Sequence, residues 1–303
     1  MCTTRCLVAV AALCVSTGAY AGSSRAWTAG KKVLPANLQM VAGANFDSIR
    51  GSQVFQKLLA DGIRKHGAAN EQLDKIKQQC NITLSDKLDS IVMGATASEH
   101  GVVVVALKSL TRKELDSCVL KVGKADKKTV TITQDGDFTR YAGITDKDVY
   151  LRWLGKDTFA MAASGEDRDL LAKMTDGGLA DDKAFKAPLG AVSMSSSMWF
   201  ALNKEQDLDQ LSTKMKSAYG TADVKGGSIN ANLHIVTSDT KSATDAAAQA
   251  TTQVDMLKQS GKVPAEFGPI LNGVKFKGAG ADLVIDAVLP EKDLLVLLTT
   301  FMH

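Results

Sequence analysis

The sequence predicts an α+β fold in which antiparallel sheets are packed against helices, arranged as two similar halves. Short apolar strands follow one another across tight turns, and strands that are this close in the chain pair antiparallel, because parallel neighbours need a long crossover. Between the strand groups lie amphipathic helices with apolar residues three and four positions apart. An apolar content of 45% and a charged content of 23% are typical of a globular protein.

The start of the chain is predicted to be a secretory signal peptide that ends at Ala21. Arg5 is its only charge, an apolar run follows over 7–15, and Ala19 and Ala21 are small residues at the −3 and −1 positions of a cleavage site. The apolar run is shorter than the about 20 residues that cross a bilayer. Two alternatives stay open, a retained membrane anchor and a lipid-modified Cys14.

Composition divides the chain into segments. A stretch of Gly, Ser, Ala and Lys follows the signal and includes Trp27, which indicates a loose leader. A second stretch rich in Gly, Asp, Lys and Ala, from Asp176 to Pro188, favours a boundary. The predicted segments are the signal peptide 1–21, a flexible leader 22–33, a first α+β half 34–176, a linker 177–190 and a second α+β half 191–303.

Net charge and hydropathy argue against a nucleic-acid partner and against a membrane-spanning segment. The formal net charge of the whole chain is +3, and loss of Arg5 with the signal lowers it to about +2. Lysines and acids are mixed along the chain, whereas nucleic-acid binding usually needs a concentrated basic face. No later stretch is long enough to span a bilayer, since Leu294–Met302 is apolar but short. We therefore expect a soluble mature protein without a nucleic-acid partner or transmembrane segment.

The first half reads as strands and helices in regular order. Its helix after Leu110 begins with a capping box, in which Thr111 and Glu114 each satisfy a free backbone amide. The run Val102–Val105 is apolar throughout, which suits a strand covered on both faces. The predicted elements are strand 40–46, helices 46–65 and 70–80, strand hairpin 88–95 and 101–107, the capped helix from 111, strands 129–134, 138–144, 149–154 and 158–163, and a helix starting at 164–167.

Two cysteines remain once the signal peptide is removed, Cys80 and Cys118. Each lies on the apolar side of a predicted helix, so both point into the same core and a disulfide is sterically plausible if their Cα atoms come within about 7 Å. Closing a loop of about 40 residues would stabilise the fold by roughly 4 kcal/mol. The alternative is a pair of buried free thiols. Neither cysteine has the Cys-x-x-Cys or Cys-His pattern of a redox or nucleophilic site.

The second half repeats the order of strands and helices predicted for the first half. A strand is predicted over 198–202, a helix is indicated by Leu208, Leu211 and Met215, and Ile229 to Ile235 alternates with polar residues as in a strand with one wet face. A long helix over 242–259, a hairpin of 274–276 with 282–289 and a helix from Pro290 complete it. Each half ends in a strand, an acidic helix start and Asp-Leu-Leu, over Phe159–Leu171 and over Leu283–Leu295. A diverged internal duplication and chance similarity both explain this.

No catalytic site, metal site or cofactor is predicted. The four histidines, His66, His100, His234 and His303, lack metal-ligand spacing and read as surface residues. The Ser-x-x-Lys pattern at Ser238 lacks the Ser-Asp-Asn and Lys-Thr-Gly partners of penicillin-interacting enzymes, so Ser238 or Thr240 is better explained as a helix cap.

The order of parts in the first half resembles that of uncharacterised secreted proteins of Gram-negative bacteria. The shared parts are Leu34-Pro35, the strand from Met40 to Phe46, a helix ending in Cys80 and a second helix carrying Cys118. The resemblance covers about the first half of the chain. It implies export and a disulfide, and it implies no catalytic residue.

Together these observations predict an exported protein, periplasmic or extracellular, that works as a non-enzymatic binding or structural protein of the bacterial envelope. Such a protein would use its sheet surfaces or the groove between its halves, with an envelope protein or an apolar ligand as partner. The alternative is a secreted hydrolase whose site is assembled from distant residues. A large apolar cleft would favour the carrier, and convergent titratable groups in a polar pocket would favour the enzyme.

Overall fold

A computed structural model describes residues 23–36, 38–65, 67–98, 100–144, 147–163, 166–174, 178–261 and 263–301. The predicted signal peptide, with its cleavage residues Ala19 and Ala21, lies outside the described residues. His66 and His303 lie outside them as well.

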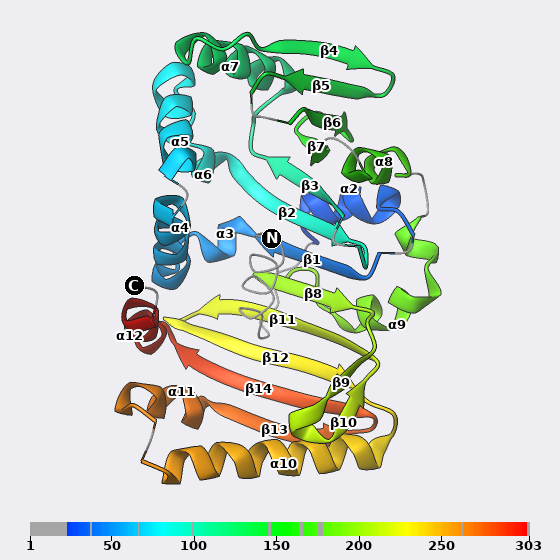
Figure 1. Ribbon diagram of the computed structural model, residues 1–303, viewed down its shortest axis with the longest axis vertical. Coiled ribbons are helices and arrows are strands. Elements are labelled where there is room, and N and C mark those ends of the chain that lie inside the picture. Colours follow the sequence, from blue (N-terminus) through cyan, green and yellow to red (C-terminus); the bar gives the residue numbers. More distant parts are fainter. Residues whose placement is uncertain are drawn as a thin grey trace.

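The described chain forms one continuous twelve-stranded sheet in which every neighbouring pair is antiparallel, so the predicted α+β class is confirmed. Its strand order is β13-β14-β12-β11-β8-β1-β2-β3-β7-β6-β5-β4, and Figure 1 shows these strands as a ladder from β4 at the top to β13 near the bottom. The strands are β1 (Met40–Asn45), β2 (Leu88–Ala95), β3 (Gly101–Leu107), β4 (Thr131–Asp135), β5 (Phe138–Ala142), β6 (Val149–Trp153), β7 (Thr158–Ala163), β8 (Met198–Leu202), β11 (Ser217–Lys225), β12 (Ser228–Val236), β13 (Val274–Ala279) and β14 (Asp282–Pro290). A separate two-stranded hairpin joins β9 (Gln206–Leu208) to β10 (Thr213–Met215).

The helices lie on both faces and along one edge of this ladder. They are α2 (Arg25–Val33), α3 (Phe46–Ile49), α4 (Gln53–Lys65), α5 (Gly67–Cys80), α6 (Leu84–Lys87), α7 (Arg112–Ala125), α8 (Glu166–Ala172), α9 (Lys183–Ala191), α10 (Thr240–Gln259), α11 (Gly268–Gly273) and α12 (Glu291–Phe301). Figure 1 shows α5, α4 and α12 in a column beside the strand ends, and α10 along β13.

The alternation of the strands gives the sheet two apolar faces. On the first face, Val104, Ala160 and Trp199 pack against side chains of α2, α8 and α9 in the main core. On the second face, Val105 and Phe159 pack toward α7 in a separate core. Val104 and Val105 are neighbours on β3 and belong to different cores, so the predicted coverage of this strand on both faces is confirmed.

The prediction of a loose leader is wrong for the part of it that the structure describes. Residues 25–33 form α2, which is capped by the Ser24 hydroxyl accepting from the Trp27 amide. Trp27 is only 8% exposed and meets Trp199 edge to face, with ring centroids 5.0 Å apart. The buried stripe of Ala26, Trp27 and Gly30 explains this outcome, because one apolar helix face suffices for docking on a sheet.

The described part of the predicted linker 177–190 is helical and packed rather than extended and free. Residues 179–181 form a 3₁₀ turn and residues 183–191 form α9, whose Phe185 is fully buried in the main core. The halves share one sheet, because β1 pairs with β8 from Met40↔Leu202 to Ala44↔Met198. The small residues at 178–190 therefore belong to a packed helical segment, so their composition does not indicate a free connection.

The two halves of the sheet follow the same path on either side of the β1–β8 pair. Outward from that pair, the first half runs β1-β2-β3-β7-β6 and the second runs β8-β11-β12-β14-β13. A helix leaves the third strand in each half, α7 after β3 and α10 after β12. The segments Phe159–Leu171 and Leu283–Leu295 occupy equivalent places, since each holds a strand bonded to that third strand and the helix after it.

One predicted helix in the second half is wrong. Leu208, Leu211 and Met215 lie in β9, a 3₁₀ turn and β10, and Ser212 between the two strands has a left-handed φ of 47° that no helix continues. The sequence reasoning also missed β11. Its alanines and Gly220 have low strand propensity, yet Gly220 suits the site because a Cβ there would lie 3.0 Å from the Phe200 ring.

Candidate functional site

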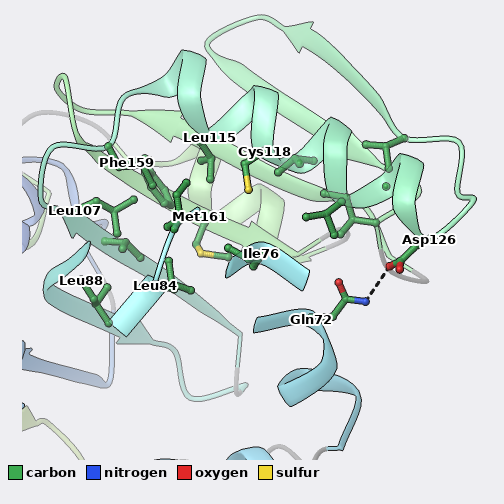
Figure 2. Close-up of a pocket in the computed structure, with 18 of the residues that line it drawn as sticks. Gln72, Ile76, Leu84, Leu88, Leu107, Leu115, Cys118, Asp126, Phe159 and Met161 are labelled. Atoms are coloured by element: carbon green, nitrogen blue, oxygen red, sulfur yellow. Dashed lines mark hydrogen bonds between the residues drawn. The ribbon is translucent and has the colours of Figure 1, made fainter. Parts of the chain in front are cut away.

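An apolar cavity of about 680 Å³ lies on the second face of the sheet, inside the first half. Figure 2 shows side chains from α5, α6, α7 and the sheet converging on it, including Ile76, Leu84, Leu115 and Phe159. Most of its lining is aliphatic. The lining residues are Gln72, Ile76, Ile82, Leu84, Leu88, Val105, Leu107, Leu110, Leu115, Cys118, Val119, Val122, Gly123, Asp126, Lys128, Val130, Ile144, Phe159 and Met161.

The disulfide predicted between Cys80 and Cys118 is present, with the two Cα atoms 5.4 Å apart. It joins the last residue of α5 to the middle of α7, so it ties together two helices that wall the cavity. The predicted capping box is confirmed too: Thr111 accepts from the Glu114 amide, and Glu114 accepts from the Thr111 amide. The start and the middle of α7 are therefore both fixed relative to the cavity.

Charged residues close one end of the cavity. The Lys75 ammonium lies 2.6 Å from the Asp126 carboxylate, and the Gln72 amide donates to the same carboxylate at 3.1 Å. These two interactions, shown in part in Figure 2, lower the pKa of Asp126 below its usual range. Lys128 donates to the carbonyl oxygen of Ile144 at 2.8 Å. The charges at this end already have partners within the protein.

A basic groove of about 390 Å³ adjoins the cavity at the disulfide. The two spaces share Ile82, Leu110 and Cys118 as lining residues. Polar and charged side chains make up most of the rest of the groove. They are Asn81, Lys87, Ser109, Lys113, Glu114, Ser117 and Lys121.

Two residues of the basic groove have left-handed backbones, Asn81 with φ 56° and Ser109 with φ 50°. Such conformations are costly for residues other than glycine, and they concentrate at ligand sites and switch regions. Here they turn the chain sharply after α5 and after β3, which brings both turns to the disulfide.

A polar cluster lies on the first face of the second half. The Tyr219 hydroxyl donates to Asp282 at 2.7 Å, His234 Nδ1 lies 2.9 Å from the same carboxylate, and the Tyr219 and His234 rings stack. His234 Nε2 lies 2.9 Å from the Asn232 amide oxygen. Burial and the bond to Asp282 raise the pKa of Tyr219, so this hydroxyl stays protonated and is a poor nucleophile.

The remaining sequence candidates have structural roles. The N-cap of α10 is Asp239, whose side chain accepts from the Ser242 amide, so the prediction of Ser238 or Thr240 as cap is wrong by one position. Lys241 pairs with Asp245, which raises the pKa of Lys241 and makes it a poor general base for Ser238. Within the described ranges, no three His, Cys, Asp or Glu side chains gather closely enough to hold a metal ion.

Sequence reasoning placed the residues of α7 that face inward but missed the cavity beneath them. Cys118 was predicted on the apolar side of its helix, and Leu115, Val119 and Val122 line the cavity from the same side. Where the two halves meet, described residues such as Phe55 and Val224 line a space of about 30 Å³, far below the volume of a typical ligand site. An apolar stripe on a helix predicts which side of the helix is buried. It does not predict whether the neighbouring side chains fill the space beneath that side.

Comparisons with known proteins inform the fold. No family model matches the chain, and no curated protein matches it. Among solved structures, three crystal forms of the protein TP0453 are similar. Form I matches with a TM-score of 0.50 at 10% identity, over 88% of this chain and 95% of TP0453, and form IV matches with 0.51 at 12%, over 91% and 99%. Form III gives 0.50 at 11% identity.

At such identities the likeness concerns the fold alone. It extends over both halves of this chain. Nowhere in the described ranges is there a helix long and apolar enough to cross a membrane.

Proposed function

We propose that this protein is an exported, non-enzymatic binding protein of the bacterial envelope that carries an apolar ligand in the cavity beneath α5 and α7. The observation that supports the proposal is the cavity itself, about 680 Å³ of space with a mainly aliphatic lining. Protein interiors are normally packed as densely as organic crystals, so an opening of this size is unusual in a purely structural domain. Ligand sites typically enclose about 300–1,000 Å³.

The proposed location, periplasmic or extracellular, depends on the predicted signal peptide and fits the disulfide. Disulfides persist in oxidising compartments and are rare in the cytosol of most organisms. The disulfide joins two helices that line the cavity. An oxidising compartment, which preserves the bond, therefore also preserves the link between these two helices. The order of parts in the first half resembles that of secreted proteins of Gram-negative bacteria. We include membership in that group in the proposal.

Neighbouring positions on α7 offer a matched test. Val119 lines the cavity, whereas Leu120 is 47% exposed and does not line it. In Val119→Trp the indole occupies the cavity, so we expect a loss of at least tenfold in affinity for the neutral apolar dye N-phenyl-1-naphthylamine. Leu120→Trp introduces the same indole at the next position of the helix, outside the cavity, and should bind the dye as the wild type does.

Dye fluorescence measures binding, and circular dichroism confirms that both variants fold. Equal dye affinity in the two variants would contradict the proposal, because filling the cavity would then have no effect on binding. Absence of dye uptake by the wild type would contradict it as well.

A hydrolase is the alternative, and the polar cluster of Tyr219, His234 and Asp282 is the feature that could support it. The cluster joins residues distant in the chain, but its hydroxyl is held protonated and it lines neither the cavity nor the basic groove. Hydrolysis of p-nitrophenyl esters by the wild type, lost in His234→Ala, would favour the enzyme.

The matching paths of the two halves support an origin by internal duplication. The order of strands outward from β1 and β8 is the same, a helix leaves the third strand in each half, and the two Asp-Leu-Leu segments occupy equivalent places. The halves differ between their first and second strands, where the first half has α3, α4, α5 and α6 and the second has the β9–β10 hairpin. In this account the first half added β4 and β5 and developed the cavity, and the second half added the β9–β10 hairpin.

A further inference from the structure

The cavity and the basic groove differ in chemistry but are neighbours in space. They share three lining residues, Ile82, Leu110 and Cys118. A ligand that occupies both spaces would pass these shared side chains beside the disulfide. Such a ligand needs an apolar body and an end that suits the groove.

The charges of the basic groove determine which chemical group of a ligand it favours. Lys87, Lys113 and Lys121 contribute three positive charges, and Glu114 contributes one negative charge. The Glu114 carboxylate already accepts from the Thr111 amide and hydroxyl, each at 2.8 Å. Lys113 and Lys121 are exposed and make no ion pair with any other residue that the structure describes. The groove thus offers cations without protein partners, which favours an anionic group.

The charges at the opposite end of the cavity are already engaged within the protein, which makes that end less suited to an anionic head. Asp126 is ionised there and is already paired with Lys75 and Gln72. Lys75 is paired with Asp126 and Glu71, and Lys128 donates to the Ile144 carbonyl oxygen, so an anion at that end would compete with protein partners for each lysine. The apolar end of the ligand therefore points toward Asp126, and its charged end lies at the disulfide.

Volume limits the apolar part. A cavity of about 150 Å³ holds one benzene molecule, so on that scale the about 680 Å³ here accommodates roughly 25 carbon atoms. One acyl chain of about 16–18 carbons fits within this space, and two such chains exceed it.

We propose that the ligand is a single-chain amphiphile with an anionic head, its chain in the cavity and its carboxylate or phosphate over Lys113 and Lys121. This inference depends on the binding function proposed above and specifies its ligand class. The contact pattern assigns the chain to α5, α7 and the sheet, and the head group to the turns at Asn81 and Ser109.

The test is displacement of N-phenyl-1-naphthylamine from the oxidised protein by palmitate, by 1-palmitoyl lysophosphatidic acid and by hexadecanol. Hexadecanol has the same chain without charge, so it reports the cavity alone. At low ionic strength we expect the anions to bind about tenfold more tightly than hexadecanol, with an advantage that shrinks as salt is added. A preference between palmitate and the lysophosphatidic acid distinguishes a carboxylate head from a phosphate head.

A pair of double variants isolates the lysines. Lys113→Gln/Lys121→Gln should lower the affinity for the anions about fivefold and leave that for hexadecanol unchanged. Lys183→Gln/Lys186→Gln removes the same charge from exposed positions of α9 and should change neither.

Two results would overturn the inference in distinguishable ways. Equal binding of hexadecanol and the anions, unaffected by Lys113→Gln/Lys121→Gln, would refute the anionic head and leave the cavity-binding function standing. Failure of all three chains to displace the dye would refute the binding of a long chain altogether.

Discussion

Removal of the Cys80–Cys118 disulfide should destabilise the protein by an amount set by the length of the loop it closes. The two cysteines are 38 residues apart, and the loop-entropy relation gives roughly 4 kcal/mol for a loop of that length at 25 °C. A domain is typically stable by about 5–15 kcal/mol. Loss of this one bond should therefore remove a large part of the total free energy of unfolding.

The perturbation is Cys80→Ala/Cys118→Ala, compared with the wild type with and without reductant. Guanidinium denaturation followed by circular dichroism gives the free energy of unfolding, and its denaturant slope should rise because the unfolded chain without a cross-link exposes more surface. The double variant serves as the control, since reductant should not change its stability.

A difference of less than about 1 kcal/mol between the oxidised wild type and the variant would refute the reasoning from loop entropy. Alkylation of Cys80 and Cys118 in unreduced protein, detected by peptide mass spectrometry, would refute the bond itself. The variant also bears on the site, because α5 and α7 lose their covalent link. We expect weaker binding of apolar dye when that link is absent.

Three further predictions concern packing and charge. Trp27→Ala removes a buried ring from the main core and should cost about 3–5 kcal/mol in thermal or chemical denaturation; stability like that of the wild type would show that α2 is not docked. Gly43→Ala places a Cβ 2.4 Å from the Trp199 ring and should cost about 1–3 kcal/mol, with recovery when Trp199→Phe is added. The hydrogen bonds from Thr111 lower the pKa of Glu114, so the stability they provide is complete above the unfolded-state pKa of about 4.3 and is lost as pH falls through the lowered folded pKa. In Thr111→Ala, NMR titration should show the pKa of Glu114 rising toward its ordinary value, and an unchanged value would contradict the role of the capping box.

Local chemistry explains why parts of the fold could be predicted from the sequence. The strands over 88–95 and 101–107 have the predicted bounds, because a continuous apolar run and a polar turn are enough to define a hairpin. The capping box at Thr111 is also a local feature, with both hydrogen bonds formed within four residues. The pairing of Cys80 with Cys118 followed from two helix faces and the absence of any other cysteine after the predicted cleavage site.

Features that depend on distant contacts were missed. Trp27 lies in a stretch whose small residues suggested a loose chain, and its burial depends on Trp199, far along the sequence. The spacing of Leu208, Leu211 and Met215 fits one face of a helix, but it also fits a short hairpin whose Met215 packs on the sheet. Periodicity alone does not separate these two cases when the segment is short.

The cavity could not be predicted for a related reason. Its lining residues come from three helices, three strands and the loops between them, and each position taken alone is an ordinary core residue. The disulfide joins α5 to α7, and the cavity lies beneath these two helices. A pattern in the sequence specifies which residues face inward, whereas the distance between elements is a property of the whole fold.

Native mass spectrometry of the protein isolated from its own host without detergent tests the central claim most directly. We predict that the wild type retains a bound mass that denaturation releases, and that Val119→Trp isolated in the same way carries none. A bare polypeptide mass in both proteins would contradict the account that the cavity holds a ligand.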